Sequence, residues 1–161
     1  MISIARLKRV FSRLVRGFAP FFAGFGASFA AQSAMDSGLK PQDPSVEMKI
    51  LMHKLTAATM DGMFAMGVVE MVQATRNLSQ HPEDYKSKKD FLGASMGFLA
   101  SGAVYNRVAG SALTFTESLK NGFFGAGLYR LYTTVKDVKA ECSAEEVTSN
   151  TRPRSSSYQR N

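Results

Sequence analysis

The chain has 161 residues, enough for one domain, and its 20 Lys and Arg outnumber its 13 Asp and Glu, which gives a formal net charge of +7. A single cysteine, Cys142, excludes an internal disulfide, and two isolated histidines, His53 and His81, exclude a His-rich zinc site. The sequence contains no nucleophile–base constellation, phosphate-binding loop or dinucleotide fingerprint, so we expect no enzymatic activity and no catalytic cofactor.

Residues 1–16 form a basic segment that contains no acidic residue, and the first acid of the chain is Asp36. Apolar residues recur there at steps of three and four, which predicts an amphipathic helix. This composition is typical of a mitochondrial targeting segment, and we interpret it as a retained helix at a membrane surface. A nucleic-acid-binding arm is the alternative, but the adjacent apolar run and the lack of stacking aromatics argue against it. The five cations are Arg6, Lys8, Arg9, Arg13 and Arg16.

Residues 17–134 are expected to form a membrane domain of four helices. Apolar segments alternate there with loops rich in proline or charge, and each segment approaches the roughly 20 residues that cross a bilayer. Because the first and third segments have no polar face, we favour an all-α, four-helix transmembrane bundle over a soluble bundle, although hydropathy alone is expected to detect only the first. The polar remainder, residues 135–161, is expected to be a disordered tail. The segments are approximately residues 15–34, 48–77, 91–105 and 108–134.

Small residues spaced four apart recur in all four segments. On a helix such residues share one face, where the missing side chains let a second backbone approach closely, as in GxxxG-type packing. A single motif of this kind also occurs in soluble proteins, but its repetition within apolar segments favours a membrane interface. The predicted helix-packing residues are Gly24, Ser28, Ala58, Gly62, Gly93, Gly97, Ser101, Gly122 and Ala126.

Charged residues interrupt the apolar segments at Asp61, Arg107, Glu117 and Lys120. A charge facing lipid costs about 2.5–3.5 kcal/mol on insertion scales, so we expect these four residues to make intramembrane polar contacts. Glu117 and Lys120 can pair within one helix, and Asp61 can reach Lys120 if the second and fourth segments pack together. A structural pair is favoured over an ion pathway, because no His relay accompanies these residues.

Two motifs carry a family resemblance: Leu55-Thr-Ala-Ala-Thr-Met-Asp-Gly-Met-Phe-Ala-Met-Gly67, and Asp90-Phe-Leu-Gly-Ala-Ser-Met-Gly97 followed by Gly102. Together with the Gly-rich stretch 110–127 and the loop ending in Lys-Lys-Asp, they resemble the inner-membrane preprotein translocase family. Within that family, the loop and third helix are most similar to the related accessory subunit of respiratory complex I (NADH:ubiquinone oxidoreductase). The resemblance covers about residues 54–132.

The resemblance implies a multi-pass protein of the mitochondrial inner membrane. Its complex I branch implies an accessory subunit of the respiratory chain that supports the membrane arm, with membrane-arm subunits as partners and a contact with complex III in a supercomplex. Its translocase branch implies a channel subunit, in which Asp61 and Glu117 would attract basic presequences. A structural subunit of another inner-membrane assembly is a third alternative. We further expect lipid contacts, including an anionic phospholipid such as cardiolipin, and no nucleic-acid partner.

Overall fold

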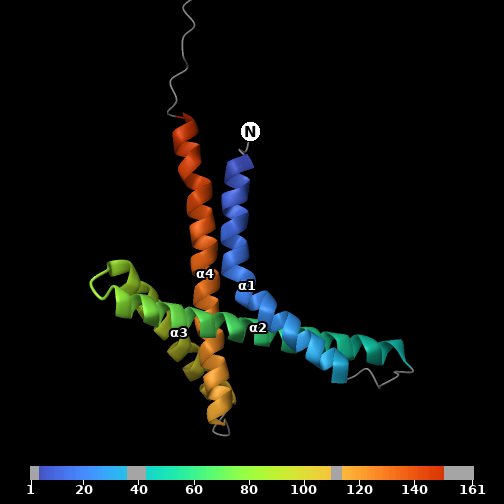
Figure 1. Ribbon diagram of the computed structural model, residues 1–161. Helices are drawn as coiled ribbons and strands as arrows, with labels where there is room; N and C mark the ends of the chain where they lie inside the picture. Colours follow the sequence, from blue (N-terminus) through green and yellow to red (C-terminus); the bar gives the residue numbers. More distant parts are fainter. Residues whose placement is uncertain (1–3, 36–42, 110–113, 151–161) are drawn as a thin grey trace, which may run out of the picture.

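The computed structural model is all-α in the residues that it describes, which are 4–35, 43–109 and 114–150 (Figure 1). Its helices are α1 (Ile4–Met35), α2 (Pro44–Gln80), α3 (Tyr85–Ala109) and α4 (Phe115–Asn150). The predicted all-α class and the prediction of four helices are therefore confirmed for this part of the chain.

Helix α1 is continuous, so the basic N-terminal segment and the first apolar segment belong to one element rather than two. The helix bends near its middle (Figure 1), and Pro20 lies inside it. Proline has no N–H to donate to the carbonyl four residues earlier, here that of Arg16, and its ring crowds that carbonyl, so the bend has a local cause. Before the bend α1 lies beside the C-terminal half of α4, and after it α1 lies along α2.

The helices form an open arrangement rather than the closed bundle expected from the sequence. Helices α2 and α4 cross at the centre, with α1 and α3 on the outside (Figure 1). Among the described residues, no Cα of α1 lies within 8 Å of a Cα of α3. Helix α4 runs across α2 rather than alongside it (Figure 1).

Helix α4 continues to Asn150, although the tail was expected to be disordered from residue 135. Residues 135–150 contain neither glycine nor proline and include Lys, Glu and Ala, which favour helix. They also lie beside α1. Polar composition was therefore a poor guide to disorder here, and the rest of the predicted tail, residues 151–161, lies outside the described residues.

The described chain has a small core and exposes many large apolar side chains. Met66 is its largest fully buried side chain, whereas Phe11, Phe22 and Leu92 are 66%, 65% and 63% exposed. Helical segments of α1 (Leu7–Met35) and α2 (Pro44–Gln80) are long and apolar enough to cross a membrane, judged by length and composition alone. Hydropathy thus detects the second apolar segment as well as the first, contrary to expectation. The buried hydrophobic residues are Ala58, Met63, Met66, Ala74, Ala94 and Ala126.

Asp84 caps the N-terminus of α3. Its carboxylate accepts hydrogen bonds from the Ser87 hydroxyl at 3.0 Å, from the Ser87 N–H at 3.1 Å and from the Lys86 N–H at 3.3 Å. These bonds, that of the Ser87 hydroxyl first, lower the pKa of Asp84 because they stabilise the charged form. The cap is therefore fully formed above the ordinary pKa range of Asp and is lost as the pH falls through the lowered value.

We expect the first turn of α3 to fray in acid because of this cap. Amide hydrogen exchange of Lys86 and Ser87 should accelerate as the pH falls through the lowered pKa of Asp84, after correction for the intrinsic pH dependence of exchange. An Asp84→Asn variant should not show this acceleration in acid, because its side chain still accepts hydrogen bonds but does not titrate in this range. A corrected exchange profile that is the same in both proteins would contradict the assignment.

Candidate functional site

The crossing of α2 and α4 is a contact between two backbones. A Cβ placed on Gly67 of α2 would overlap the Phe123 carbonyl of α4, and one placed on Gly127 of α4 would overlap the Met63 carbonyl of α2. Only glycine fits at either position without a backbone shift. Neither glycine belongs to a predicted pair, although Gly67 shares one helical face with the buried Met63 and Ala74.

The small residues predicted in the first two apolar segments meet each other between α1 and α2. A Cβ on Gly24 would lie 2.7 Å from the Cβ of Ala65, and one on Gly62 would lie 2.9 Å from the Phe21 carbonyl oxygen. Ala58, one turn before Gly62, is fully buried. Here the four-residue spacing marks a surface where the two helices lie close together.

The predicted small residues of α3 and α4 also face each other. A Cβ on Gly97 would lie 2.7 Å from the Gly125 carbonyl oxygen, and a Cβ on Gly93 would overlap the ring of Tyr129. A Cβ on Gly122 would overlap the ring of Phe98, and a Cβ on Gly125 would overlap the Ser101 side chain. Ala126 is fully buried. By contrast, a Cβ on Gly26 or Gly102 would meet nothing within 4 Å.

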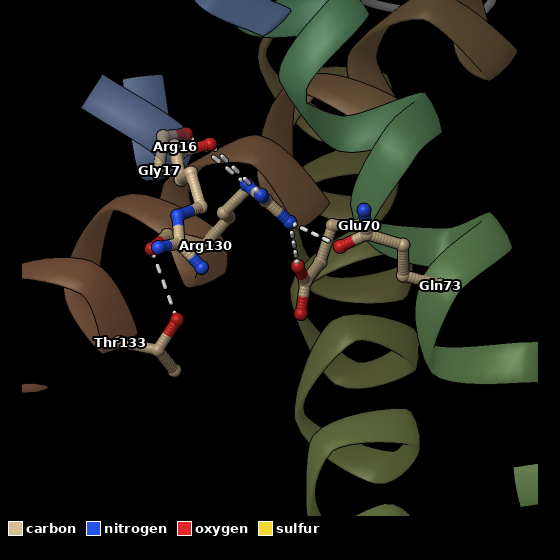
Figure 2. Close-up of polar contacts among 6 residues, drawn as sticks. All are labelled: Arg16, Gly17, Glu70, Gln73, Arg130 and Thr133. Atoms are coloured by element: carbon tan, nitrogen blue, oxygen red, sulfur yellow. Dashed lines mark hydrogen bonds and ion pairs between the residues drawn. The ribbon is translucent and has the colours of Figure 1, made fainter. Parts of the chain in front are cut away.

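A charged junction joins three helices beside the α2–α4 crossing. Arg130 of α4 donates from Nη1 to Glu70 Oε2 and to Gln73 Oε1 of α2, both at 2.8 Å (Figure 2). The side chains of Arg130 and Glu70 are only 13% and 12% exposed, so the ion pair is largely shielded from water. The charge-assisted bonds therefore hold α2 against α4 at the level of the glycines.

The same guanidinium reaches the bend of α1. Arg130 donates from Nε to the Gly17 carbonyl at 3.2 Å and from Nη2 to the Arg16 carbonyl at 3.5 Å (Figure 2). Pro20 cannot donate to the Arg16 carbonyl within the helix, so Arg130 supplies a donor to the acceptor that the proline leaves without one. One side chain thus ties α4 to α2 and to the bend of α1.

The sequence patterns do not single out Glu70 or Arg130 as a pair, although one signal is present. Glu70 follows Gly67 by three residues, and Arg130 follows Gly127 by three residues. Residues three apart lie on the same helical face, so each charge sits one turn beyond its close-contact glycine. An acid and a base that each follow a glycine by three residues, on two different helices, would have indicated that these helices cross at the glycines.

The four charged residues predicted from the sequence do not form one cluster. Asp61 of α2 faces α1, where it accepts a 2.6 Å hydrogen bond from the Ser28 hydroxyl. It therefore makes no contact with Lys120 of α4 in the described structure. Lys120 is exposed, as is Arg107 in the last turn of α3, where a cation suits the negative end of the helix dipole.

Glu117 is exposed and caps the N-terminus of its own helix, α4. Its Oε2 accepts hydrogen bonds from the N–H and the hydroxyl of Thr114, each at 2.9 Å, while the Glu117 N–H donates to the Thr114 hydroxyl oxygen at 3.3 Å. This reciprocal arrangement is a capping box. Glu117 and Lys120 lie on one helix but form no ion pair within 4.0 Å among the described residues.

The basic segment of α1 pairs with the extension of α4. Arg13 and Arg9 lie 3.0 and 3.7 Å from the two carboxylate oxygens of Glu141. Nearer the bend, a Cβ on Gly17 would lie 2.5 Å from Thr134, so the two helices come very close there. This half of α1 is therefore held beside α4, whereas the sequence predicted a separate helix at a membrane surface.

Ser28→Ala is expected to loosen the α1–α2 pair. Gln32 donates to the Ser28 hydroxyl oxygen at 2.9 Å, and Ser28 donates to Asp61, so the substitution removes the donor that joins the helices. We expect a loss of about 1–2 kcal/mol in the free energy of unfolding, measured by denaturation in mild detergent, because a partly buried carboxylate loses its partner. Ser143→Ala, whose hydroxyl bonds only within α4, is the matched control. Equal losses in the two variants would contradict a role for the Ser28–Asp61 bond.

The described residues contain no group of three or more His, Cys, Asp or Glu side chains that could hold a metal ion. The site instead consists of structural contacts: the helix backbones meet at glycines, and the shielded ion pair between Arg130 and Glu70 joins α4 to α2, while Arg130 also binds α1. No protein-family model matches the chain, and no curated protein or solved structure matches it.

Proposed function

We propose that this chain is a non-catalytic structural subunit embedded in a membrane, whose outer surface is covered by lipid and by partner subunits. The observation that carries the proposal is the distribution of apolar side chains: the helices meet through glycine and alanine, while large apolar side chains point outward. In water such a surface would favour aggregation. In a bilayer it is the expected surface, because lipid is as apolar as the side chains.

We further propose that the membrane is the mitochondrial inner membrane and that the assembly is respiratory complex I. The basic N-terminal segment without acids and the motifs at 55–67 and 90–97 support this assignment. In this role the chain would stabilise the membrane arm, assist its assembly and contribute to contacts with complex III. An outer surface made of apolar side chains suits such a subunit, because neighbouring subunits can cover it.

A translocase channel is the alternative, and the positions of two acids favour the accessory role over it. A channel for basic presequences needs acids that face a polar groove open to the substrate. Asp61 instead binds Ser28 between α1 and α2, and Glu117 caps α4. The large groove beside α3 and α4 is lined mainly by apolar and small residues. A structural role in a different inner-membrane assembly would use the same surface.

Migration of the chain in its native membranes tests the proposal. Mitochondria would be solubilised gently, complexes separated on a native gel, and the chain located by mass spectrometry. Comigration with NADH dehydrogenase activity is expected, together with loss of that band when the chain is depleted. Migration in a smaller complex with import components would contradict the complex I assignment and favour the channel. Migration with a different respiratory assembly would redirect the structural role to that assembly.

A further inference from the structure

Helices α3 and α4 leave an apolar groove of about 780 Å³ on the outside of the molecule, within the size range of small-molecule sites. Gly93, Gly97 and Gly125 line it, so the missing side chains that bring the helices together also hollow the surface beside them. Side chains along its sides are exposed: Val104 is 64% and Leu128 46% exposed. The groove is therefore open along its length and accessible from the apolar exterior.

One end of the groove is marked by two tyrosines. Tyr129 and Tyr132 line it there, and the Tyr129 hydroxyl donates to the Lys89 carbonyl at 3.5 Å. Asp90, an acid of α3, lies at this end as well. Tyrosine is enriched where a membrane meets water, because the ring is apolar and the hydroxyl is polar. This end therefore has the chemistry of a membrane–water boundary.

Lysines lie beyond the tyrosines. Helices α3 and α4 are antiparallel, with Gly97 against the Gly125 backbone and Gly93 against the ring of Tyr129. Lys86 lies two turns before Gly93 on α3, and Lys136 lies two turns after Tyr129 on α4, so both lie toward this end of the groove. Both lysines are exposed, and neither forms an ion pair with a described acidic residue. Two cations without ion-pair partners thus lie at the same end of the groove as the tyrosines.

We propose that this groove binds an anionic phospholipid, with an acyl chain along α3 and α4 and the head-group phosphate at the end that carries Lys86 and Lys136. Apolar walls suit the chain, tyrosines suit the ester region, and the two cations complement a negative head group. A zwitterionic lipid could fill the same walls, but its net charge of zero would gain less from the two lysines. The inference rests on the proposed membrane location of the chain and is independent of which complex contains it.

The test uses the full-length chain in lipid nanodiscs that contain phosphatidylglycerol and phosphatidylcholine, followed by native mass spectrometry of the released protein. The wild type should retain phosphatidylglycerol in preference to phosphatidylcholine. Removing the cations (Lys86→Ala with Lys136→Ala) should abolish the preference. Filling the groove (Ala100→Phe) should remove retention of either lipid, since Ala100 lines the groove and is exposed.

Matched controls separate the site from general effects of charge or size. Lys49→Ala with Lys120→Ala removes two exposed lysines that do not line the groove, and Ala103→Phe adds the same ring at an exposed position of α3 outside it. Both controls should retain lipid as the wild type does. Unchanged retention in the Ala100→Phe variant, or an equal loss in either control, would overturn the proposal. Circular dichroism confirms that each variant keeps its helices.

A photo-crosslinker at Val104, in the wall of the groove, identifies the occupant in native membranes. Crosslinks to phospholipid are expected, and a crosslink mainly to another polypeptide would overturn the lipid assignment in favour of a partner helix. Failure of the chain to insert into nanodiscs would contradict the proposed membrane function together with this inference. Insertion without preferential retention of phosphatidylglycerol would contradict this inference alone.

Discussion

Gly67→Ala is expected to disrupt the crossing of α2 and α4 and to cause one of the largest losses of stability available from a single methyl group. The added Cβ would lie 2.6 Å from the Phe123 carbonyl carbon and closer still to its oxygen, so the two backbones must separate. Overpacking typically costs about 1–3 kcal/mol, and we expect the upper end of that range or more, because the obstacle is rigid backbone rather than a side chain.

The measurement is denaturant unfolding in mild detergent, followed by circular dichroism, with Gly26→Ala as the matched control. A Cβ on Gly26 would meet nothing within 4 Å, so that substitution should stabilise α1 by about 0.5–1 kcal/mol through helix propensity alone. The two alanines should therefore act in opposite directions. Similar small effects at both positions would show that α2 and α4 do not approach as closely as described.

Arg130→Met should be at least as damaging, because it strands a buried carboxylate. Glu70 is 12% exposed, and its Oε2 accepts a 2.8 Å bond from Arg130. Removing one partner of a buried ion pair typically costs about 3–5 kcal/mol, since the remaining charge is left without compensation. The bend of α1 also loses the donor to the Gly17 carbonyl. The free energy of unfolding in mild detergent is the quantity to measure.

A double-mutant cycle separates the pair from the rest of the junction. Combining Arg130→Met with Glu70→Met removes both charges, and much of the lost stability should return because apolar side chains can replace a buried pair at little net cost. The deficit that remains includes what Arg130 contributes through its bond to Gln73 and its bonds to the bend of α1. Additive losses in the double variant would mean that the two side chains do not interact.

The parts of the fold that were predictable are those set by local periodicity. Four helices follow from four apolar stretches, and pairs such as Gly24 with Ser28 and Ala58 with Gly62 were identified because a four-residue spacing places small residues on one face. Which helices would meet was not predictable, because the spacing of a motif does not name its partner. Gly67 and Gly127 form the tightest crossing without belonging to any predicted pair.

The contacts of the polar residues were harder to predict. Each charged residue was considered for the free energy of facing lipid, and not for the hydrogen bonds that it can make to nearby backbone groups. Glu117 lies three residues after Thr114, a spacing that also fits a capping box, and that is how the structure uses it. Arg130 has no such local signature. Its role depends on the bend at Pro20, which brings carbonyls of α1 within reach of α4, and that is a tertiary event.

Alkaline carbonate extraction of native membranes tests most directly the central claim that these helices are covered by lipid and partner subunits. Carbonate releases soluble and peripheral proteins and leaves membrane-spanning proteins in the pellet. We predict that the full-length chain stays in the pellet, because large apolar side chains such as Phe22 and Leu92 point outward. Release into the supernatant as a folded, monodisperse protein would contradict the membrane assignment, and with it the proposed place of this chain in a respiratory complex.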